Sequence, residues 1–513
     1  MRKLWLLAVG LLLAGTIQAP TAHATGTPLV ALASAAWQTN APVQAVHVAK
    51  GKVYVGGKFT RVRPPGAAAG TNETARSYLA VFNATSGGLD PMNLILNEGG
   101  QIWSITSTPT GSRVFIGGDF TTVNGQAHNR IAAIDTTTMK LIPGFATQVD
   151  WRVKTMASYG NVLYIGGSFN NVTGTGQTKA PRKRLAALNN ATGGLLSWTP
   201  TTDDADVHAI DVADNGSRVL IGGDFNTVNG TSRYGLASLT PYPNTKGTLQ
   251  AFKASAAMPQ PTNSCVSRVK DIETYGDRIY VAAAGDGAGC FDGTFAATVS
   301  GLGELVWKNY CLGATEAITY VKGWLYKGSH AHDCSKNGDF PEGPWGNRFL
   351  LVQSITTGRI GPWVPNTNAT GDTQVGPLAM ATGGADLWVG GDFTTVNGKG
   401  QQGLTRFTGL GNGAVPTKPA KPTATTPSSR RVDVSIPAAA TDNDDTILTY
   451  RLLRWTVGQL VTSKQVVSTF WWKPKVTLTD TSLSPGTKVQ YRIEVTDGKN
   501  TVRSDYSNIV TVK

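Results

Sequence analysis

Along most of this chain, short apolar segments recur, and each carries one variable residue of a type that contacts ligands. The residue two places further on stays apolar in every copy. Together the variable residues supply an indole, two ammonium groups, an imidazole, a carboxylate and an amide, which suit a sugar or a small anionic group. We take this column as the candidate ligand-contact set, with channel water as the alternative occupant. Its members are Gln44, Trp103, Lys154, His208, Lys270, Glu316 and Gly376.

Carboxylates close to the same segments keep a catalytic alternative open. Glycosidases use two carboxyl groups about 5–10 Å apart, one as acid and one as base or nucleophile. Asp203, Asp204, Asp206 and Glu316 are placed to share one face of such a fold. The sequence has no nucleophile elbow, no His-Glu-x-x-His motif and no phosphate-cradling glycine loop. A hydrolase or lyase acting on polysaccharide is therefore the alternative to a non-catalytic binding protein.

Four cysteines predict two disulfides. Cys265 and Cys311 each lie seven residues before the same repeat position, while Cys290 and Cys334 each follow the next strand. We therefore expect Cys265 to pair with Cys290 and Cys311 to pair with Cys334, and we expect no metal and no cofactor. The alternative is a metal site, whose donors would come from His330, His332, Asp333 and Cys334.

A glycine-pair strand follows each variable residue and would hold it in place. The segment 114–120 reads Val-Phe-Ile-Gly-Gly-Asp-Phe, and close copies stand at 53–59, 163–169, 219–225 and 387–393. Seven aligned strands begin 46 to 62 residues apart, which leaves room for four short antiparallel strands and their loops. Asn-Gly turns suited to tight hairpins follow several of them. These features predict an all-β fold with a seven-bladed β-propeller over residues 25–413.

The repeat also predicts how neighbouring blades meet. Glycine inside a strand allows a close backbone approach or a bulge, and the phenylalanine after it is expected to wedge between blades. The residues 29–32 resemble the outer part of a repeat, so we expect the N-terminal segment to complete the last blade. An Asp before the phenylalanine, with an Arg downstream, predicts a charge-assisted hydrogen bond inside the blade. These pairs are Asp119 with Arg130, Asp224 with Arg233, and Asp392 with Arg406.

The N-terminus and the net charge bear on where the protein works. Two basic residues, an apolar run over 4–14 and Ala-His-Ala at 22–24 predict a signal peptide over 1–24 and export from the cell. No later segment is apolar enough to span a membrane. The net charge of +13 is spread thinly, which argues against nucleic acid and favours anionic cell-wall polymers or acidic glycans. We expect a monomer.

A second domain follows a change in composition. The residues 414–424 are rich in proline and lysine and predict a stiff linker. The residues 425–513 alternate apolar and polar side chains, and the turn leading into Tyr491 fits the tyrosine corner of a fibronectin type III-like sandwich. The acidic run 441–445 is predicted to be a solvated loop, with a weak calcium site as the alternative.

These motifs together resemble a class of exported actinobacterial proteins. Its members pair a β-propeller of delta-60-like repeats, of the Ile-Gly-Gly-Asp-Phe type, with a C-terminal fibronectin type III domain. The resemblance covers about residues 28–413 for the repeats and implies no catalytic residues, while the sandwich implies a spacer or adhesive module. We therefore expect a secreted, non-catalytic protein that binds a glycan, a cell-wall polymer or another protein on the propeller face.

Overall fold

The computed structural model describes residues 27–513, except 288, 372–373, 385, 412 and 456–457. The predicted signal peptide, residues 1–24, lies outside the described residues. What is described consists of β-strands with two short 3-10 segments, η1 (Lys253–Ala257) and η2 (Ser335–Asn337), and contains no α-helix. The all-β prediction is therefore confirmed. We also find no helix, in the part of the chain that can be described, with the length and hydropathy needed to cross a membrane.

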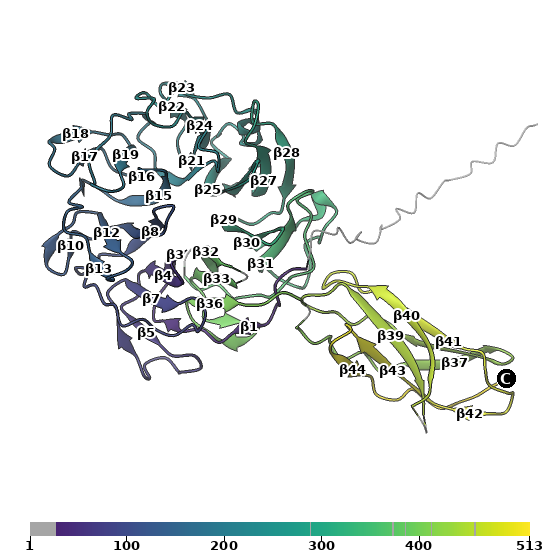
Figure 1. Cartoon of the computed structure of the whole chain (residues 1–513). Helices are drawn as coiled ribbons and strands as arrows, with labels where there is room; N and C mark the ends of the chain where they lie inside the picture. Colours follow the sequence, from purple (N-terminus) through teal and green to yellow (C-terminus); the bar gives the residue numbers. More distant parts are fainter. Residues whose placement is uncertain (1–26, 288, 372–373, 385, 412, 456–457) are drawn as a thin grey trace, which may run out of the picture.

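Seven antiparallel sheets of the described chain lie around a common centre (Figure 1). We number them one to seven in chain order and give their strands from the centre outward. Sheets one to three are β3 (Val43–Ala49), β4 (Lys52–Gly57), β7 (Leu79–Asn83); β8 (Ile102–Ser107), β9 (Arg113–Gly118), β12 (Ile131–Asp135), β13 (Lys140–Leu141); and β15 (Val153–Tyr159), β16 (Val162–Gly167), β19 (Leu185–Asn189). Sheets four and five are β20 (Val207–Val212), β21 (Val219–Gly223), β24 (Leu236–Leu239); and β25 (Val266–Tyr275), β26 (Arg278–Asp286), β27 (Gly293–Thr298), β28 (Leu305–Tyr310). Sheets six and seven are β29 (Thr315–Val321), β30 (Trp324–Ala331), β31 (Arg348–Ser354); and β32 (Pro377–Gly383), β33 (Asp386–Gly391), β36 (Leu404–Phe407), β1 (Ala33–Ser34).

The sheets close into a ring. The innermost strand of each sheet contacts the innermost strand of the next, and β32 of sheet seven contacts β3 of sheet one. The N-terminal strand β1 is the outer strand of sheet seven, where Ala33 lies opposite Phe407 of β36. A closed ring of radially arranged antiparallel sheets is a β-propeller. Because the ring is closed, the inner edge of every sheet is protected by its neighbours. The propeller and its completion by the N-terminal segment agree with the prediction from the sequence.

Apolar side chains fill the spaces between neighbouring sheets. Phe120, which follows the glycine pair of sheet two, is fully buried in a cluster that also contains Tyr54 and Val81 of sheet one. Phe169 occupies the same position between sheets two and three, beside Phe115 and Val153. The phenylalanine of the repeat is therefore the wedge that the sequence predicts.

Short outer hairpins decorate the ring. Three of them turn through an Asn-Gly pair in which both residues have positive φ, for example Asn124 at 50° and Gly125 at 75°. Such turns match the twist of a two-residue hairpin. The outer strands are β2 (Gln38–Thr39), β5 (Arg61–Arg63), β6 (Thr74–Ala75), β10 (Thr122–Val123), β11 (Gln126–Ala127), β14 (Gln148–Val149), β17 (Asn171–Thr173), β18 (Lys179–Pro181), β22 (Thr227–Val228), β23 (Thr231–Ser232), β34 (Thr395–Val396) and β35 (Lys399–Gly400).

Both predicted disulfides are confirmed. Cys265 is paired with Cys290 beside the β25–β26 hairpin of sheet five, and the two Cα atoms are 5.3 Å apart. Cys311 is paired with Cys334 in sheet six, with the Cα atoms 4.1 Å apart. Sheets five and six are the ones whose strands lack the glycine-pair signature. Each disulfide closes a loop within its own sheet and so ties the strands that the repeat signature does not specify.

The C-terminal part forms a separate two-sheet core beside the ring (Figure 1). Tyr491 is fully buried there, and its hydroxyl donates to the carboxylate of Asp480 at 2.8 Å. The first sheet contains β37 (Thr423–Ser428), β38 (Arg431–Ile436) and β41 (Val476–Asp480). The second contains β40 (Leu460–Val467), β39 (Ile447–Arg454), β43 (Tyr491–Thr496) and β44 (Thr501–Arg503), and a two-stranded ribbon pairs β42 (Lys488–Val489) with β45 (Val510–Thr511).

The acidic run 441–445 joins the two parts of the chain. One oxygen of the Asp444 carboxylate accepts the backbone N–H groups of Ala31, Gly413 and Ala414, at 2.9 to 3.0 Å. Asp442 and Asp444 are only 6% and 5% exposed. The prediction of a solvated loop is therefore wrong, because the N-terminal segment and the linker fold over the loop and use its carboxylate as an acceptor.

Aromatic rings add a second contact between ring and sandwich. Phe470 of the sandwich lies 5.1 Å from Phe340 and 6.0 Å from Trp345 of the ring, measured between ring centroids. The guanidinium of Arg348 lies over the same phenyl ring at 3.9 Å. The two parts are thus held together by a buried carboxylate and by aromatic rings in tilted and edge-to-face contact.

Candidate ligand-binding site

The variable column predicted from the sequence coincides with a β-bulge at the start of each inner strand. In sheet two, Ile102 lies opposite Gly118 and Ser104 opposite Gly117, so Trp103 between them has no partner. A bulge re-aims the side chain of its extra residue, which is why such positions often carry function. The same irregularity places Gln44, Lys154, His208, Lys270 and Glu316.

The alignment of the seventh segment needs a correction. In sheet seven the bulge falls between Pro377 and Ala379, so its residue is Leu378. Gly376, assigned to the column from the sequence, lies before the strand and is buried. The two-residue shift arises because this inner strand has no polar residue at its bulge to mark the register. One position of the ring is therefore apolar.

In the sheets that carry it, the glycine pair makes room for the bulge. A Cβ on Gly118 would overlap the carbonyl oxygen of Gln101, directly before the bulged strand. A Cβ on Gly117 would lie 2.7 Å from a methyl group of Val153 in the next sheet. The second glycine thus lets the inner hairpin kink and the first lets neighbouring sheets close up. The recurring spacing of the glycine pair and the variable bulge residue are therefore two parts of the same local structure.

Trp103 belongs to a polar cluster centred on Asp119. The Asp119 carboxylate accepts the indole N–H of Trp103 at 2.9 Å and the side-chain amide of Gln101 at 2.8 Å. It also pairs with Arg152 of the neighbouring sheet at 2.7 Å. The Arg152 guanidinium lies 4.7 Å from the centroid of the Trp103 ring. The indole is therefore fixed in position on its edge and covered on one face.

The cluster continues around the ring through Lys154 and His208. Lys154 Nζ lies 2.7 Å from Asp206 Oδ2 and 3.5 Å from His208 Nδ1, both from the next sheet. His208 Nε2 in turn lies 2.8 Å from Asp224 Oδ2. Arg268 reaches the other oxygen of Asp224 at 3.3 Å. Each side chain thus touches one from a neighbouring strand or sheet, and the contacts run in a single direction.

The last ion pair of the series joins two bulge residues directly. Lys270 Nζ lies 3.3 Å from Glu316 Oε2, across the boundary between sheets five and six. Lys154 Nζ also lies 6.0 Å from the centroid of the Trp103 ring, so the column residues of sheets two, three and four contact in turn. Sheet four reaches sheet five through Asp224 and Arg268, two residues before Lys270. Gln44 of sheet one stands apart, with its buried amide oxygen unpartnered among the described atoms. We call the connected residues from Gln101 to Glu316 the bulge network.

Side chains of the bulge network are held but still accessible. The ion-paired Asp119, Arg152, Lys154, Asp206, His208, Asp224, Arg268, Lys270 and Glu316 are 14% to 31% exposed. Cations and carboxylates alternate, so the network presents donors and acceptors side by side. Such an arrangement is preorganised for a polar ligand, because its side chains lose little freedom on binding.

The expected Asp–Arg pairing inside each repeat is wrong. Arg130 donates to the backbone carbonyl of Asp119, while the Asp119 carboxylate faces Arg152. Arg233 donates to the Ser232 carbonyl, and Arg406 pairs with Asp386. The aspartate points along the bulged edge toward the next sheet, so its cation comes from there.

Hydrogen bonds and ion pairs lower the pKa of two aspartates of the network. Burial acts to raise the pKa of Asp206, but hydrogen bonds from Lys154 and Ser168 outweigh it and the pKa is lowered. The pKa of Asp224 is lowered in the same way, with burial opposed by the hydrogen bond from His208. A general acid must hold a proton near neutral pH. Asp206 therefore does not fit the general-acid role of the glycosidase alternative.

The other carboxylates proposed for catalysis are also engaged. Asp203 accepts the backbone N–H of Asn226 at 2.8 Å. Asp204 is 84% exposed and lies 3.9 Å from Arg184. Cys334 is in a disulfide and supplies no thiolate for the proposed His/Cys metal site. Among the described residues, no group of three or more His, Cys, Asp or Glu side chains is arranged to hold a metal ion.

Two buried carboxylates on the inner strands were not predicted from the sequence. Asp211 accepts the backbone N–H of Thr274 at 2.7 Å, and Asp271 accepts that of Ile318 at 2.9 Å, each from the next inner strand. Burial raises the pKa of Asp211 to about 6 and that of Asp271 to about 7. The only signal in the sequence was a charged residue inside an apolar strand. These two carboxylates join neighbouring inner strands through hydrogen bonds to backbone N–H groups.

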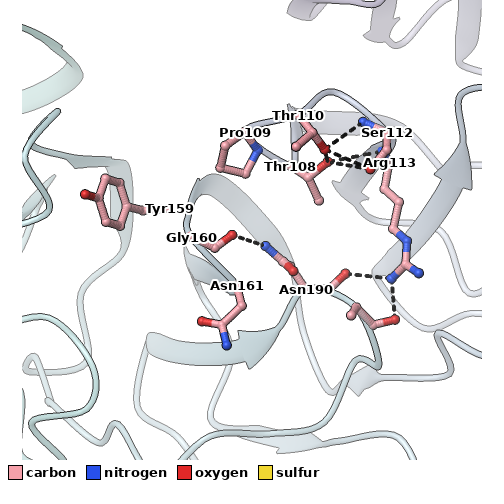
Figure 2. A pocket seen from close by; sticks show the side chains of 10 residues that line it. Thr108, Pro109, Thr110, Ser112, Arg113, Tyr159, Gly160, Asn161 and Asn190 are labelled. Atoms are coloured by element: carbon pink, nitrogen blue, oxygen red, sulfur yellow. Dashed lines mark hydrogen bonds between the residues drawn. The ribbon is translucent and has the colours of Figure 1, made fainter.

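A groove of about 680 Å³ lies at the opposite end of the inner strands, between sheets two and three (Figure 2). Its polar groups are already paired with one another. Arg113 donates to the carbonyls of Asn190 and Ala191, and Asn190 donates to that of Gly160. The ring of Tyr159 points away from the other lining residues (Figure 2). The groove lacks the alternating carboxylates and cations that the bulge network presents.

Comparisons with known proteins give the following result. No family model matches the chain, and no curated protein matches it. A chain in a crystal structure of the mitotic checkpoint complex covers 78% of this chain and 99% of its own length, at 13% identity and a TM-score of 0.44. Sqt1 from Saccharomyces cerevisiae covers 75% and 100%, at 10% identity and a TM-score of 0.41. A likeness at these identities and TM-scores says nothing of what this chain binds.

Proposed function

We propose that this protein is a secreted, non-catalytic binding protein that recognises an extracellular glycan or cell-wall polymer at the bulge network. The observation that carries the proposal is that scaffold positions repeat from sheet to sheet while the bulge residue changes. A repeated residue serves the fold, whereas a residue that varies at an accessible, preorganised position is free to serve a ligand. A protein partner is the alternative ligand.

The proposal includes the architecture. Each of the seven sheets is one blade of a seven-bladed propeller over residues 25–413, followed by a linker over 414–424 and a fibronectin type III-like sandwich over 425–513. The antiparallel two-sheet core around Tyr491 supports the last assignment. The resemblance to delta-60-like repeat proteins belongs to the same proposal. Export through the signal peptide at 1–24 is supported by the two disulfides, which persist in oxidising surroundings.

Hydrogen-bonding chemistry favours a sugar as the ligand. Sugar hydroxyl groups both donate and accept, and the network offers carboxylate acceptors such as Asp119 and Asp224 next to cationic donors such as Arg152 and Arg268. A neutral or weakly charged ligand can bind there without leaving a buried charge unpaired. A highly charged ligand of either sign would have to break several of these pairs.

Depletion from solution tests the proposal. Purified residues 25–513 are mixed with a panel of insoluble polysaccharides and bacterial cell walls, and the unbound protein is measured. We expect selective depletion by one class of polymer, with no soluble sugar released on long incubation. Release of sugar that stops in Glu316→Gln would instead establish the glycosidase or lyase. Absence of depletion by every polymer would overturn glycan recognition and favour a protein partner.

A further inference from the structure

Trp151 is an exposed indole at a place where the fold asks for a small residue. It stands two residues before the first residue of inner strand β15. The six equivalent positions in the other sheets are occupied by Ala41, Gly100, Ala205, Ser267, Gly313 and Val375. The Trp151 side chain is 56% exposed, and burying such a ring elsewhere would have stabilised the fold. The scaffold therefore does not explain this tryptophan.

The indole is attached to the edge of the bulge network. The Arg130 guanidinium lies 5.5 Å from the centroid of the Trp151 ring. The same guanidinium donates to the carbonyl oxygen of Asp119, whose carboxylate holds Trp103 and Arg152. Trp151 is also the residue directly before Arg152. A ligand on the bulge network thus reaches Trp151 without leaving the face.

Two exposed lysines lie on a neighbouring hairpin. Asp150, next to Trp151, accepts the backbone N–H groups of Asn170 and Asn171 at 2.9 and 3.0 Å. Asn170 in turn accepts the backbone N–H of Arg182 at 2.7 Å, which places the hairpin containing β18 beside the indole. Lys179 and Lys183 on this hairpin are exposed. The charge of Lys179 helps to lower the pKa of Asp150, while no salt bridge of Lys183 is found among the described residues.

We propose that Trp151 and Arg130 form a stacking subsite for a sugar ring that carries an acidic group. This inference rests on the function proposed above and adds the ligand class. The indole would cover the apolar face of the ring, and Arg130 together with the lysines at 179 and 183 would attract the carboxylate. The net charge of +13 draws anionic polymers toward the protein in the same sense.

Single-stranded nucleic acid also combines anionic groups with flat rings, and the structure favours the sugar. Nucleic-acid platforms stack successive bases on several aromatic side chains along a basic groove. Here one exposed indole is followed by a network in which carboxylates such as Asp206 and Asp224 alternate with the cations. A sugar hydroxyl can hydrogen-bond those carboxylates, whereas a phosphate backbone would be repelled by them.

The test compares three probes and four proteins. Probes of matched length are a galacto-oligosaccharide ending in one galacturonate, the same oligosaccharide with a neutral galactose at that end, and oligo-dT, titrated calorimetrically at low and at physiological salt. Proteins are wild type, Trp151→Ala, Trp151→Phe and Trp455→Ala. Trp455 is the matched control, because it is 48% exposed but lies in the sandwich. Thermal midpoints establish that each variant is folded, which we expect because small residues stand at the equivalent positions.

We expect the galacturonate-terminated probe to bind most tightly, with affinity falling as salt rises. Trp151→Ala should weaken it by about tenfold, Trp151→Phe should retain part of the affinity, and Trp455→Ala should match wild type. Equal affinity for the neutral probe would overturn the acidic ligand, and preference for oligo-dT would overturn the sugar. Unchanged binding by Trp151→Ala would remove the subsite while leaving the proposed function intact. If the polymer panel also fails to deplete the wild type, the proposed function falls with it.

Discussion

Lys154 Nζ lies 2.7 Å from Asp206 Oδ2 across the boundary between sheets three and four. The sequence placed these two residues in different roles, Lys154 as a ligand contact and Asp206 as a catalytic acid. Their pairing makes them one unit of the bulge network, in which the lysine keeps the aspartate ionised. The network therefore behaves as a fixed, charge-balanced surface, and its stability should depend on each of its links.

Removing the carboxylate charge from this pair should destabilise the ring. Asp206→Asn leaves the Lys154 ammonium, only 14% exposed, without its partner. We expect a loss of about 1–2 kcal/mol in the free energy of unfolding, measured by urea denaturation. Asp204→Asn is the matched control, since its side chain is 84% exposed, and it should change little. Equal losses in both variants would mean that the pair has no specific role.

The glycine pair should tolerate no side chain. Gly118→Ala forces a methyl group onto the Gln101 carbonyl oxygen at the bulge, and we expect a loss of about 2 kcal/mol or more in the free energy of unfolding. Gly144→Ala provides the comparison, because its added methyl group meets open space and its φ is not positive. If Gly118→Ala were as stable as Gly144→Ala, the bulge would not depend on close backbone approach.

Stability should depend on pH through the buried carboxylates. Burial raises the pKa of Asp271 from 3.8 to about 7, so the folded state holds a proton that the unfolded chain releases. Stability from this group is complete below about pH 4 and is lost as the pH rises to about 7. Asp271→Asn removes the titration while keeping an acceptor for the Ile318 N–H. The variant should therefore lose less stability than wild type between pH 5 and pH 8, by on the order of 2 kcal/mol.

Parallel pH dependences of wild type and Asp271→Asn would contradict this assignment. The comparison is made as a difference between the two proteins because His47 titrates in the opposite sense. Burial lowers the pKa of His47 to about 4, so its contribution to stability rises between about pH 4 and pH 6.5. That contribution is common to both proteins and cancels.

The Asp444 carboxylate should hold the sandwich against the ring. Asp444→Ala removes the acceptor of three N–H groups, from Ala31, Gly413 and Ala414. We expect faster proteolysis of the linker and a larger radius of gyration in small-angle X-ray scattering. Asp433→Ala, which removes a carboxylate that pairs with Arg431 within the sandwich, should leave both measurements unchanged. An unchanged radius of gyration in Asp444→Ala would show that the aromatic contacts suffice.

Local repetition made the scaffold and the bulge column predictable from the sequence. Glycine pairs and phenylalanine wedges recur, so residues such as Trp103 and His208 stand out against them. Interactions between sheets were not predictable, because the partner of Asp119 is Arg152, 33 residues away, and not Arg130 in the same repeat. The burial of Asp444 was not predictable for the same reason, because one of its N–H donors is Ala31, 413 residues earlier in the chain.

Two features had weaker signals in the sequence. Trp151 became visible only when the bulges fixed the register and showed small residues at the equivalent places. The sequence points to Gly376 in place of Leu378 because the last inner strand has no polar bulge residue to mark its register. Both cases show that the bulge, a feature of backbone pairing, has to be known before single positions can be compared.

The most direct test of the central claim compares two lysines that form the same kind of ion pair. Lys270 pairs with Glu316 in the bulge network at 3.3 Å, and Lys253 pairs with Glu304 outside it at 2.8 Å. Binding of wild type, Lys270→Ala and Lys253→Ala to the polymer that depletes the protein would be measured side by side. We predict that Lys270→Ala weakens binding by about tenfold while Lys253→Ala matches wild type. Equal affinities for all three proteins would contradict ligand recognition at the bulge network.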